Sequence, residues 1–266
     1  MSVSLKENKA IAMVLWFASV LALWETAAIV LKYVIKVPYA DTKLPLLNLV
    51  VVEIIRQHAT LLRQSEDTFF NAMVGFALGA LVGSTIAILM GFWKTMERII
   101  MPYAVASQMV PVIGLAPIVF GILHNASLSR IVISGYVTFL PVSISVLRGL
   151  KGVSTTHLEL MKICAASRTT VFAKLKWKSA LPNLFVGLKL SAPLAVTAAI
   201  LVELMGAPNG IGVMMMNSIY YGTNEIYMFW ATVIASVVIG MLAFLLVVSL
   251  ERLITPWQPE FRRKVG

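Results

Sequence analysis

Residues able to perform acid–base or metal chemistry are few in this chain, and they do not cluster in the sequence. His58, His124 and His157 fall in three different loops or loop edges, too dispersed for the ligand set of a metal site. The serines in the apolar segments have no recognisable base beside them, and no G-x-x-x-x-G-K-[ST] loop for ATP phosphates is present. We therefore expect no catalytic residue, no metal and no ATP site in this chain.

The more informative polar or helix-breaking residues stand inside long apolar runs. Glu203 lies near the end of one run, where an acid is costly and often functional, so solute binding, gating and a structural contact are all open. Glu25 is expected to have an interfacial or interhelical partner. Pro111 and Pro117 flank Gly114, and such prolines mark either a plain kink or a broken helix that lines a pathway. The candidate pathway or gating residues are Gln108, Met109, Pro111, Gly114, Pro117, Tyr136 and Glu203.

The composition indicates that a membrane protein positions these residues. Hydrophobic residues make up 59% of the 266-residue chain and charged residues 13%, which is typical of a protein with many membrane spans. The net charge of +10 does not indicate nucleic acid, because the basic residues lie in loops beside the apolar runs. Cys164 is the single cysteine, so an internal disulfide is excluded.

Six apolar runs are each long enough, at about 20 residues, to cross the hydrocarbon core. The first is interpreted as a retained helix and not as a signal peptide, because no small-residue cleavage site accompanies it. The sequence therefore predicts an all-α membrane protein with six transmembrane helices. The expected spans are residues 10–31, 69–92, 101–123, 129–147, 184–205 and 229–250.

Lysine and arginine concentrate in alternate loops, which predicts that both termini are cytoplasmic. The loop after the fourth run is rich in both residues, whereas residues 206–228 contain neither. We expect residues 1–9 to form a cytoplasmic N-terminus, residues 10–250 the transmembrane domain and residues 251–266 a cytoplasmic tail. On the outer side, Leu46 to Leu62 is expected to form an amphipathic helix at the membrane interface.

Small and flexible residues give hints about helix packing. Gly75, Gly79 and Gly83 are spaced four apart, so they share one helix face and allow another backbone to approach closely. We expect ordinary packing within this chain, with a subunit interface as the alternative. The run Met214–Met216 is expected to be buried just outside the fifth span, and an adaptable contact with a solute or another protein is the alternative.

The long basic loop between the fourth and fifth runs carries the strongest functional signal. Two short helix-forming stretches lie between Thr155 and Lys178, and together they would project a compact knob toward a partner protein. This loop resembles the EAA loop of type I ABC importer permeases, whose pattern is Glu-Ala-Ala, three residues, then Gly-Ala-Ser-Arg. The matching positions are Glu159, Leu160, Met161, Ala165, Ala166, Ser167 and Arg168.

Flanking segments make the resemblance more specific. Leu181 to Lys189 is similar to the family's entry to the fifth span, and Val202 to Gly212 is similar to its exit. Gly75 to Gly79 and Pro111 to Pro117 match the second and third spans in the right order. The resemblance points to the branch that serves nitrate, sulfonate, taurine, bicarbonate, pyrimidine and riboflavin importers.

The resemblance implies a permease subunit of the bacterial inner membrane. Its implied partners are ABC ATPase subunits that bind ATP and magnesium, a second permease copy, an extracytoplasmic solute-binding protein and membrane lipid, with no nucleic acid. Residues 155–182 would form the coupling loop. The implied ATPase-coupling residues are Glu159, Lys162, Ala165, Ala166, Ser167 and Arg168.

Departures from the family pattern leave the dimer open. Ala165 replaces a glycine that would permit positive φ, and Lys178 replaces a proline. Ile122 to His124 stand in place of Trp-Phe-Gly. These changes fit either a heterodimer, in which the second permease has the more regular loop, or drift in a homodimer.

The solute is predicted from the charges in the spans. The second to fourth runs hold no interior Lys or Arg, because Arg130 is expected at an outer edge, so an anion would meet few compensating charges. A neutral heterocycle such as a pyrimidine or riboflavin is therefore favoured, with a small anion such as a sulfonate, taurine or nitrate as the alternative. Two hypotheses come from other functional classes: an integral membrane enzyme and a structural membrane scaffold. The missing acid–base cluster argues against the enzyme. Co-purification with an ATPase would exclude the scaffold.

Overall fold

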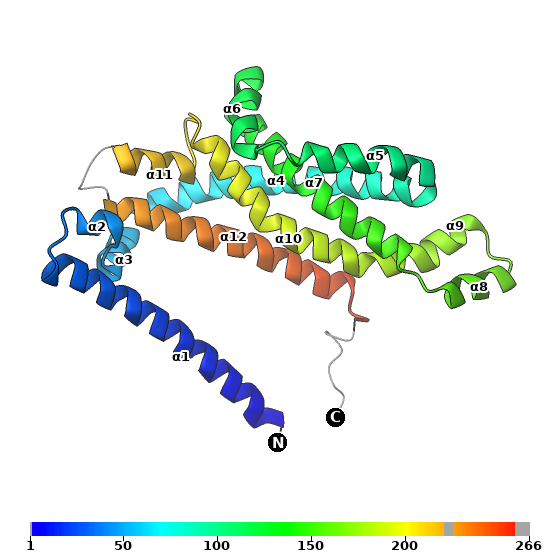
Figure 1. The fold of residues 1–266 in the computed structure, drawn as a ribbon, viewed down its shortest axis with the longest axis horizontal. Helices are drawn as coiled ribbons and strands as arrows, with labels where there is room; N and C mark the ends of the chain where they lie inside the picture. Colours follow the sequence, from blue (N-terminus) through cyan, green and yellow to red (C-terminus); the bar gives the residue numbers. More distant parts are fainter. Residues whose placement is uncertain (1, 221–225, 259–266) are drawn as a thin grey trace. The chain divides into compact units, whose positions relative to one another are not determined.

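The computed structural model describes residues 2–220 and 226–258, and every regular element in these ranges is a helix (Figure 1). Helices are expected because a backbone surrounded by lipid has to satisfy its hydrogen bonds within the segment. Met1 of the predicted N-terminal segment and residues 259–266 of the predicted tail lie outside the described ranges. The elements are α1 (Ser2–Ile29), η1 (Val30–Val34), α2 (Ala40–Lys43), α3 (Leu47–Arg56), α4 (His58–Phe92), α5 (Lys94–Ser107), α6 (Val112–Leu123), α7 (Ala126–Lys151), α8 (Thr155–Ile163), α9 (Arg168–Val171), η2 (Phe172–Lys176), α10 (Trp177–Glu203), α11 (Ile211–Tyr220) and α12 (Ile226–Ile254).

Five helical segments within the described residues are long and apolar enough to cross a membrane as continuous helices. With a bent pair of shorter helices counted as one more span, the described chain has six, which agrees with the predicted all-α fold. The continuous segments are Val14–Val34, His58–Phe92, Ala126–Lys151, Arg168–Glu203 and Ile226–Ile254.

The third predicted span, residues 101–123, is not one continuous helix: of the two possibilities that its prolines left open, the structure has a break and not a plain kink. Helices α5 and α6 meet at an angle of 92° across the break between Ser107 and Val112. Pro111 explains the position of the break, because proline has no N–H to donate and disfavours helical geometry in the residue before it. Pro111 itself is extended, with ψ 122°, and it begins α6 as the N-cap.

The chain divides into two compact units, and each is described by itself. The first comprises the described residues of 1–62 and 214–234. Within it, the Glu25 carboxylate accepts a hydrogen bond of 2.9 Å from the N–H of Leu47, at the start of α3, so Glu25 has the interhelical partner predicted for it. The predicted amphipathic helix Leu46 to Leu62 is shorter than expected: α3 ends at Arg56, and the residues after Gln57 already belong to α4.

The second unit comprises the described residues of 63–213 and 235–266, and it holds the main helix packing. Buried side chains of α4, α10 and α12, among them Phe76, Phe185 and Val247, form one core cluster. A second cluster joins α4, α7 and α10 and includes the buried side chains of Met90 and Val146. Both clusters include side chains of α4 and α10.

Three glycines of α4 lie directly against the backbone of α7. A Cβ added to Gly75, Gly79 or Gly83 would overlap the carbonyl oxygen of Ile131, Gly135 or Phe139, respectively. These α7 residues are also spaced four apart, so the two helices touch once per turn over three successive turns. The glycine spacing is thus used for packing inside this chain, as the sequence predicted.

The predicted methionine run belongs to a helix. Met214 to Met216 are half-buried in α11. Residues 221–225, between α11 and α12, lie outside the described ranges.

Candidate functional site

The predicted knob is a helix, a turn and a second helix, which extend beyond the ends of α7 and α10 (Figure 1). Ser154 caps α8 by accepting a hydrogen bond from the N–H of His157, and Ser167 caps α9 by accepting one from Thr170. Serine favours such positions because its hydroxyl satisfies an N–H that the helix leaves unpaired. Two serines therefore fix where each short helix begins.

The turn between α8 and α9 is a Schellman motif built around an alanine. The N–H of Ala166 bonds to the carbonyl of Met161 at 3.0 Å, and the N–H of Ala165 bonds to that of Lys162 at 2.9 Å. These are the two bonds that define the motif, and they require a left-handed residue at the position that Ala165 occupies. Ala165 has φ +49°, so this chain adopts the conformation that a glycine would allow without steric cost.

The knob presents charged and apolar side chains outward. Glu159 and Arg168 are exposed. On one continuous helix their spacing of nine residues would place them on different sides, but here a turn separates α8 from α9 between them. Leu160 is 57% exposed and Ile163 is 82% exposed. Ala166 and Met161 are half-buried in the turn, whereas Lys162 and Ser167 are exposed. Apolar side chains on a projecting helix are typical of a surface that another protein covers.

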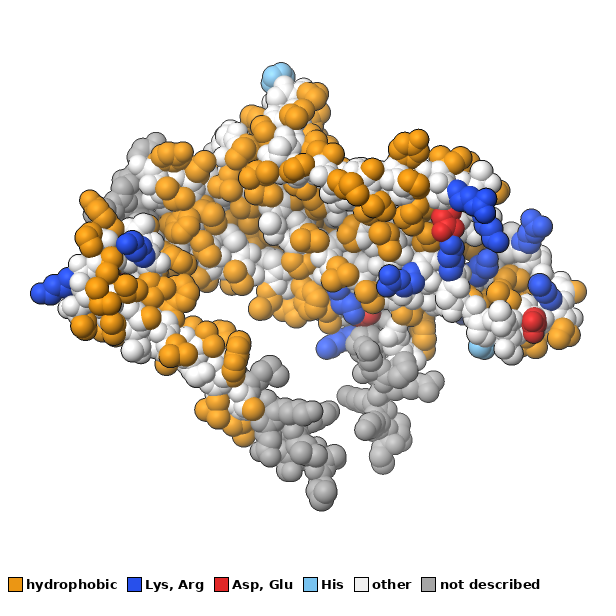
Figure 2. Space-filling view, viewed as in Figure 1, with side chains coloured by type: hydrophobic (Ala, Val, Ile, Leu, Met, Phe, Trp, Pro, Cys, Tyr) orange, Lys and Arg blue, Asp and Glu red, His pale blue; other side chains and the backbone are white. Residues whose placement is uncertain are grey.

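Lysine and arginine gather at the same end of the second unit. On the face shown in Figure 2, they crowd over α5, α8 and α9, whereas the middle of the unit is mostly hydrophobic. This distribution is typical of the side of a membrane protein that faces the cytoplasm.

The candidate pathway residues fall into two groups. Five lie at or after the break between α5 and α6, where Met109 is 76% exposed and Pro111, Gly114 and Pro117 are also exposed. Gln108 is tied to α7, because its amide donates a hydrogen bond of 2.9 Å to the carbonyl of Tyr136. The Tyr136 hydroxyl donates in return to the carbonyl of Ser107, the last residue of α5. Two reciprocal hydrogen bonds thus hold the break against α7.

Glu203, the seventh candidate, lies in a different, fully buried cluster. Its carboxylate accepts hydrogen bonds from the Thr68 hydroxyl at 2.7 Å, from Arg130 at 2.9 Å and from the N–H of Gly212 at 2.8 Å. Gly210 has φ +121°, and a Cβ there would collide with the Glu203 carboxyl group. The chain after α10 therefore folds back over this carboxylate, and glycine is needed for it to come so close.

Arg130 joins three elements through the same cluster. Besides Glu203 on α10, it contacts Asp67 on α4 at 3.4 Å and the side-chain oxygen of Asn209 at 3.2 Å. Asn209 also donates to Asp67, so the loop after α10 is bound to both helices. This set of charges and amides links α4 at Asp67 to the start of α7 and the end of α10.

Arg130 is buried, which the sequence did not predict. It lies near the start of α7, at the edge of its run as expected, but only 1% of it is exposed. Burial is tolerated because two carboxylates, Glu203 and Asp67, neutralise the guanidinium. The available signal was that an acid in one apolar run implies a partner of opposite charge in another.

Within residues 2–220 and 226–258, no group of three or more His, Cys, Asp and Glu side chains is placed to hold a metal ion.

Comparison with known proteins identifies the family. Residues 75–256 match the model of the family described as "Binding-protein-dependent transport system inner membrane component". The formylaminopyrimidine transport permease protein ThiX of Halalkalibacterium halodurans is 30% identical over 207 residues, which cover 73% of this chain and 80% of that protein. The putative aliphatic sulfonates transport permease protein SsuC of Bacillus subtilis is 29% identical over 195 residues, which cover 73% of this chain and 70% of that protein.

A solved structure supports the fold. The crystal structure of an amino acid ABC transporter with histidines superposes with a TM-score of 0.62 and 14% sequence identity, over 76% of this chain and 98% of that chain. The chain therefore belongs to the inner membrane components of binding-protein-dependent transport systems: it is a multi-pass permease subunit of a bacterial ABC importer and is not itself catalytic.

Proposed function

We propose that this chain and a second permease copy form the pathway by which a small solute crosses the bacterial inner membrane, and that ABC ATPases dock on α8 and α9. The solute would arrive from an extracytoplasmic solute-binding protein, and ATP and magnesium would be bound by the ATPases. Membership of a binding-protein-dependent family supports both kinds of partner. The basic end of the second unit supports an orientation in which α8, α9 and both termini are cytoplasmic.

The observation that carries the docking proposal is the capped, rigid turn with an exposed apolar edge. Leu160 and Ile163 would fill a groove of the ATPase, and Glu159 and Arg168 would lie at its rim. The Schellman bonds hold Ala165 and its neighbours in one shape, so closure of the ATPases would push the segment as a unit. Lys162, Ala166 and Ser167 complete the proposed docking surface.

Docking is tested by changing this surface without touching the spans. Glu159→Lys reverses a rim charge; the ion pair itself is worth about 1 kcal/mol or less, but the reversal adds repulsion inside a fitted groove. Ala166→Trp blocks close packing and is expected to be worse. Both variants would be expressed with the binding protein and ATPase, then assayed for complex recovery and for ATP hydrolysis stimulated by solute-loaded binding protein.

Glu66→Lys provides a matched control for complex recovery, because it makes the same charge reversal at an exposed position of α4. Recovery is expected to fall for the two α8–α9 variants and to stay normal for the control. Normal recovery and normal stimulation in both docking variants would mean that α8 and α9 are only a connector.

For the solute, we infer a neutral or aromatic heterocycle. Arg130 is interior, but Glu203 and Asp67 neutralise it, so it offers no free positive charge to an anion. The proposed pathway residues at the helix break, Gln108, Met109 and Tyr136, are uncharged. Relatives named for formylaminopyrimidine and riboflavin transport are consistent with this class.

A small anion remains the alternative, because other relatives are named for aliphatic sulfonates and taurine. Reconstituted importer would be supplied with each solute-binding protein candidate and assayed for uptake of pyrimidines, riboflavin, taurine and a sulfonate. Uptake restricted to taurine, sulfonate or nitrate would exclude the heterocycle proposal and leave the permease assignment intact.

A further inference from the structure

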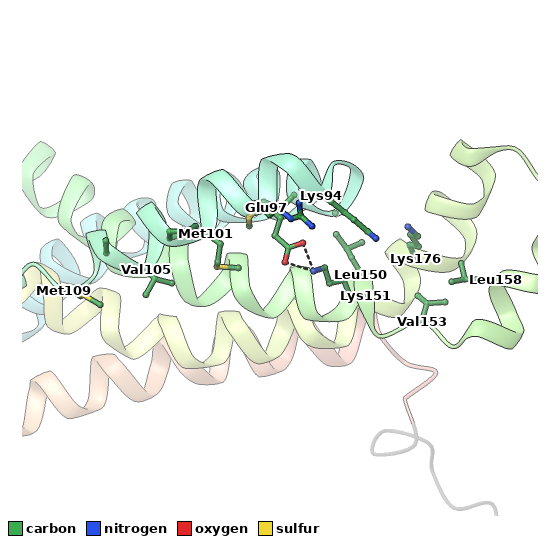
Figure 3. Close-up of a pocket in the computed structure, with 15 residues that line it drawn as sticks. Lys94, Glu97, Met101, Val105, Met109, Leu150, Lys151, Val153, Leu158 and Lys176 are labelled. Atoms are coloured by element: carbon green, nitrogen blue, oxygen red, sulfur yellow. Dashed lines mark hydrogen bonds and ion pairs between the residues drawn. The ribbon is translucent and has the colours of Figure 1, made fainter.

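A groove of about 730 Å³ lies in the second unit, between α5, the end of α7 and the segment that carries the proposed docking helix (Figure 3). It is lined at one end by charged side chains and along the rest by apolar ones. The ATPase-docking surface described above does not include it, because Leu158 and Lys176, the α8 and η2 residues that line it, lie outside that surface. Its chemistry therefore calls for a separate explanation.

The charged end of the groove has a surplus of cations. Lys94, Arg98, Lys151 and Lys176 line it, against the single carboxylate of Glu97. Glu97 is already paired, because Lys151 donates to both of its oxygens at 2.5 Å. In Figure 3 the Lys94 and Lys176 side chains extend toward the same part of the groove, beyond that pair. Three cations consequently face the groove without a lining carboxylate to neutralise them.

The start of α5 adds to this positive field. Lys94 is the first residue of the 14-residue helix, and the first N–H groups of a helix carry partial positive charge. Glu97, in the first turn, offsets part of that effect. An occupant with a phosphate or similar anionic group would suit this end of the groove.

The other wall is apolar and follows the axis of α5. Met101 and Val105 are spaced four apart and share one face of α5, and Met109, just past the end of the helix at Ser107, lines the same groove. Val105 is 39% exposed and Met109 is 76% exposed. A free phosphate or a nucleotide would satisfy the cations but leave this wall uncovered, whereas a hydrocarbon chain would cover it.

We propose that the groove binds an anionic phospholipid, with its phosphate against Lys94, Arg98 and Lys176 and an acyl chain along Met101 and Val105. Basic pockets beside membrane helices are suited to anionic headgroups because the charges act at short range near the membrane surface. A bound lipid would join α5 to α8 and η2, since Leu158 and Lys176 line the same groove. The lipid thereby braces the base of the helix pair that the ATPase is proposed to push.

Binding is tested on the full chain, purified in detergent and stripped of lipid. Native mass spectrometry would follow titration with dioleoylphosphatidylglycerol, with dioleoylphosphatidylcholine of the same chains, and with inorganic phosphate. Each cation near an anionic headgroup changes affinity about fivefold, so Lys94→Gln with Arg98→Gln is expected to weaken phosphatidylglycerol binding about 25-fold. Arg148→Gln with Lys178→Gln, two exposed cations that do not line the groove, is expected to leave it unchanged.

A second variant tests the apolar wall with all cations in place. Val105→Trp would fill the groove from a half-exposed position and is expected to remove phosphatidylglycerol binding while thermal unfolding stays normal. The proposal is overturned by equal binding of the two lipids, by equal losses in the two charge variants, by unaltered binding in Val105→Trp, or by phosphate competing as well as the lipid. Because neither solute nor ATPase is used, these outcomes are independent of the transport and docking proposals.

Discussion

Replacing Arg130 by methionine should destabilise the protein strongly, because it leaves the buried Glu203 carboxylate without its cation. The side chains of Arg130 and Glu203 are 1% and 0% exposed, and removal of one partner from a buried pair costs about 3–5 kcal/mol. Glu203 keeps its hydrogen bonds to Thr68 and to the N–H of Gly212, so a loss near 3 kcal/mol is expected. Glu203→Gln should cost about 2 kcal/mol, since Arg130 then retains Asp67.

The double variant distinguishes an interacting pair from two independent sites. If Arg130 and Glu203 stabilise one another, Arg130→Met with Glu203→Gln loses at least about 1 kcal/mol less than the sum of the single losses. The free energy of unfolding would be measured in mixed micelles, with hydrogen exchange at residues 204–212 as a local report. Arg63→Met, an exposed arginine of α4, serves as the control and should change stability by no more than about 0.5 kcal/mol. Additive losses, or an unchanged Arg130→Met, would refute the buried cluster as described.

Three further outcomes are expected. Ala165→Gly should stabilise the α8–α9 turn by about 1 kcal/mol, because it removes the cost of a left-handed alanine. Slower hydrogen exchange at the turn would confirm this, and faster exchange would contradict the Schellman geometry. Gly79→Ala should lower the free energy of unfolding by about 1–3 kcal/mol, because the added Cβ overlaps the backbone of α7. Gly114→Ala should leave the free energy of unfolding unchanged, because its Cβ meets nothing within 4 Å. Equal losses in the two variants would count against the tight contact between α4 and α7. Reporter fusions after Asn217 should be exported and those after Lys174 should stay inside, and the reverse at either site would overturn the proposed orientation.

Much of the fold could be predicted because apolar length and charge bias act locally along the chain. Each predicted span has a helical counterpart, and the turn inside the basic loop occurs at Ala165, where the family pattern has a glycine. The glycine spacing on α4 likewise predicted a close contact, since the three positions share one face in any helix.

The parts that could not be predicted depend on contacts between distant segments. Arg130, Glu203 and Asp67 are separated by more than 60 positions in sequence, and nothing local to any of them reveals that they meet. The 92° break at Pro111 is similar, because a proline at Pro117 or Pro102 leaves its helix continuous. Which proline ends a helix depends on whether neighbouring groups can satisfy the freed carbonyls.

The contact between Gly79 and the backbone of α7 has a mechanical consequence for transport. Backbone atoms have no rotamers, so α4 cannot slide along α7 without forcing a side chain onto a carbonyl at each of three turns. These two helices should travel as one rigid body when the importer changes state. The deformation then falls on joints made by side chains, such as the Gln108 and Tyr136 bonds at the broken span, which a change of rotamer releases. The glycines of α4 thereby help determine which helices move together and which contacts between helices change when the importer changes state.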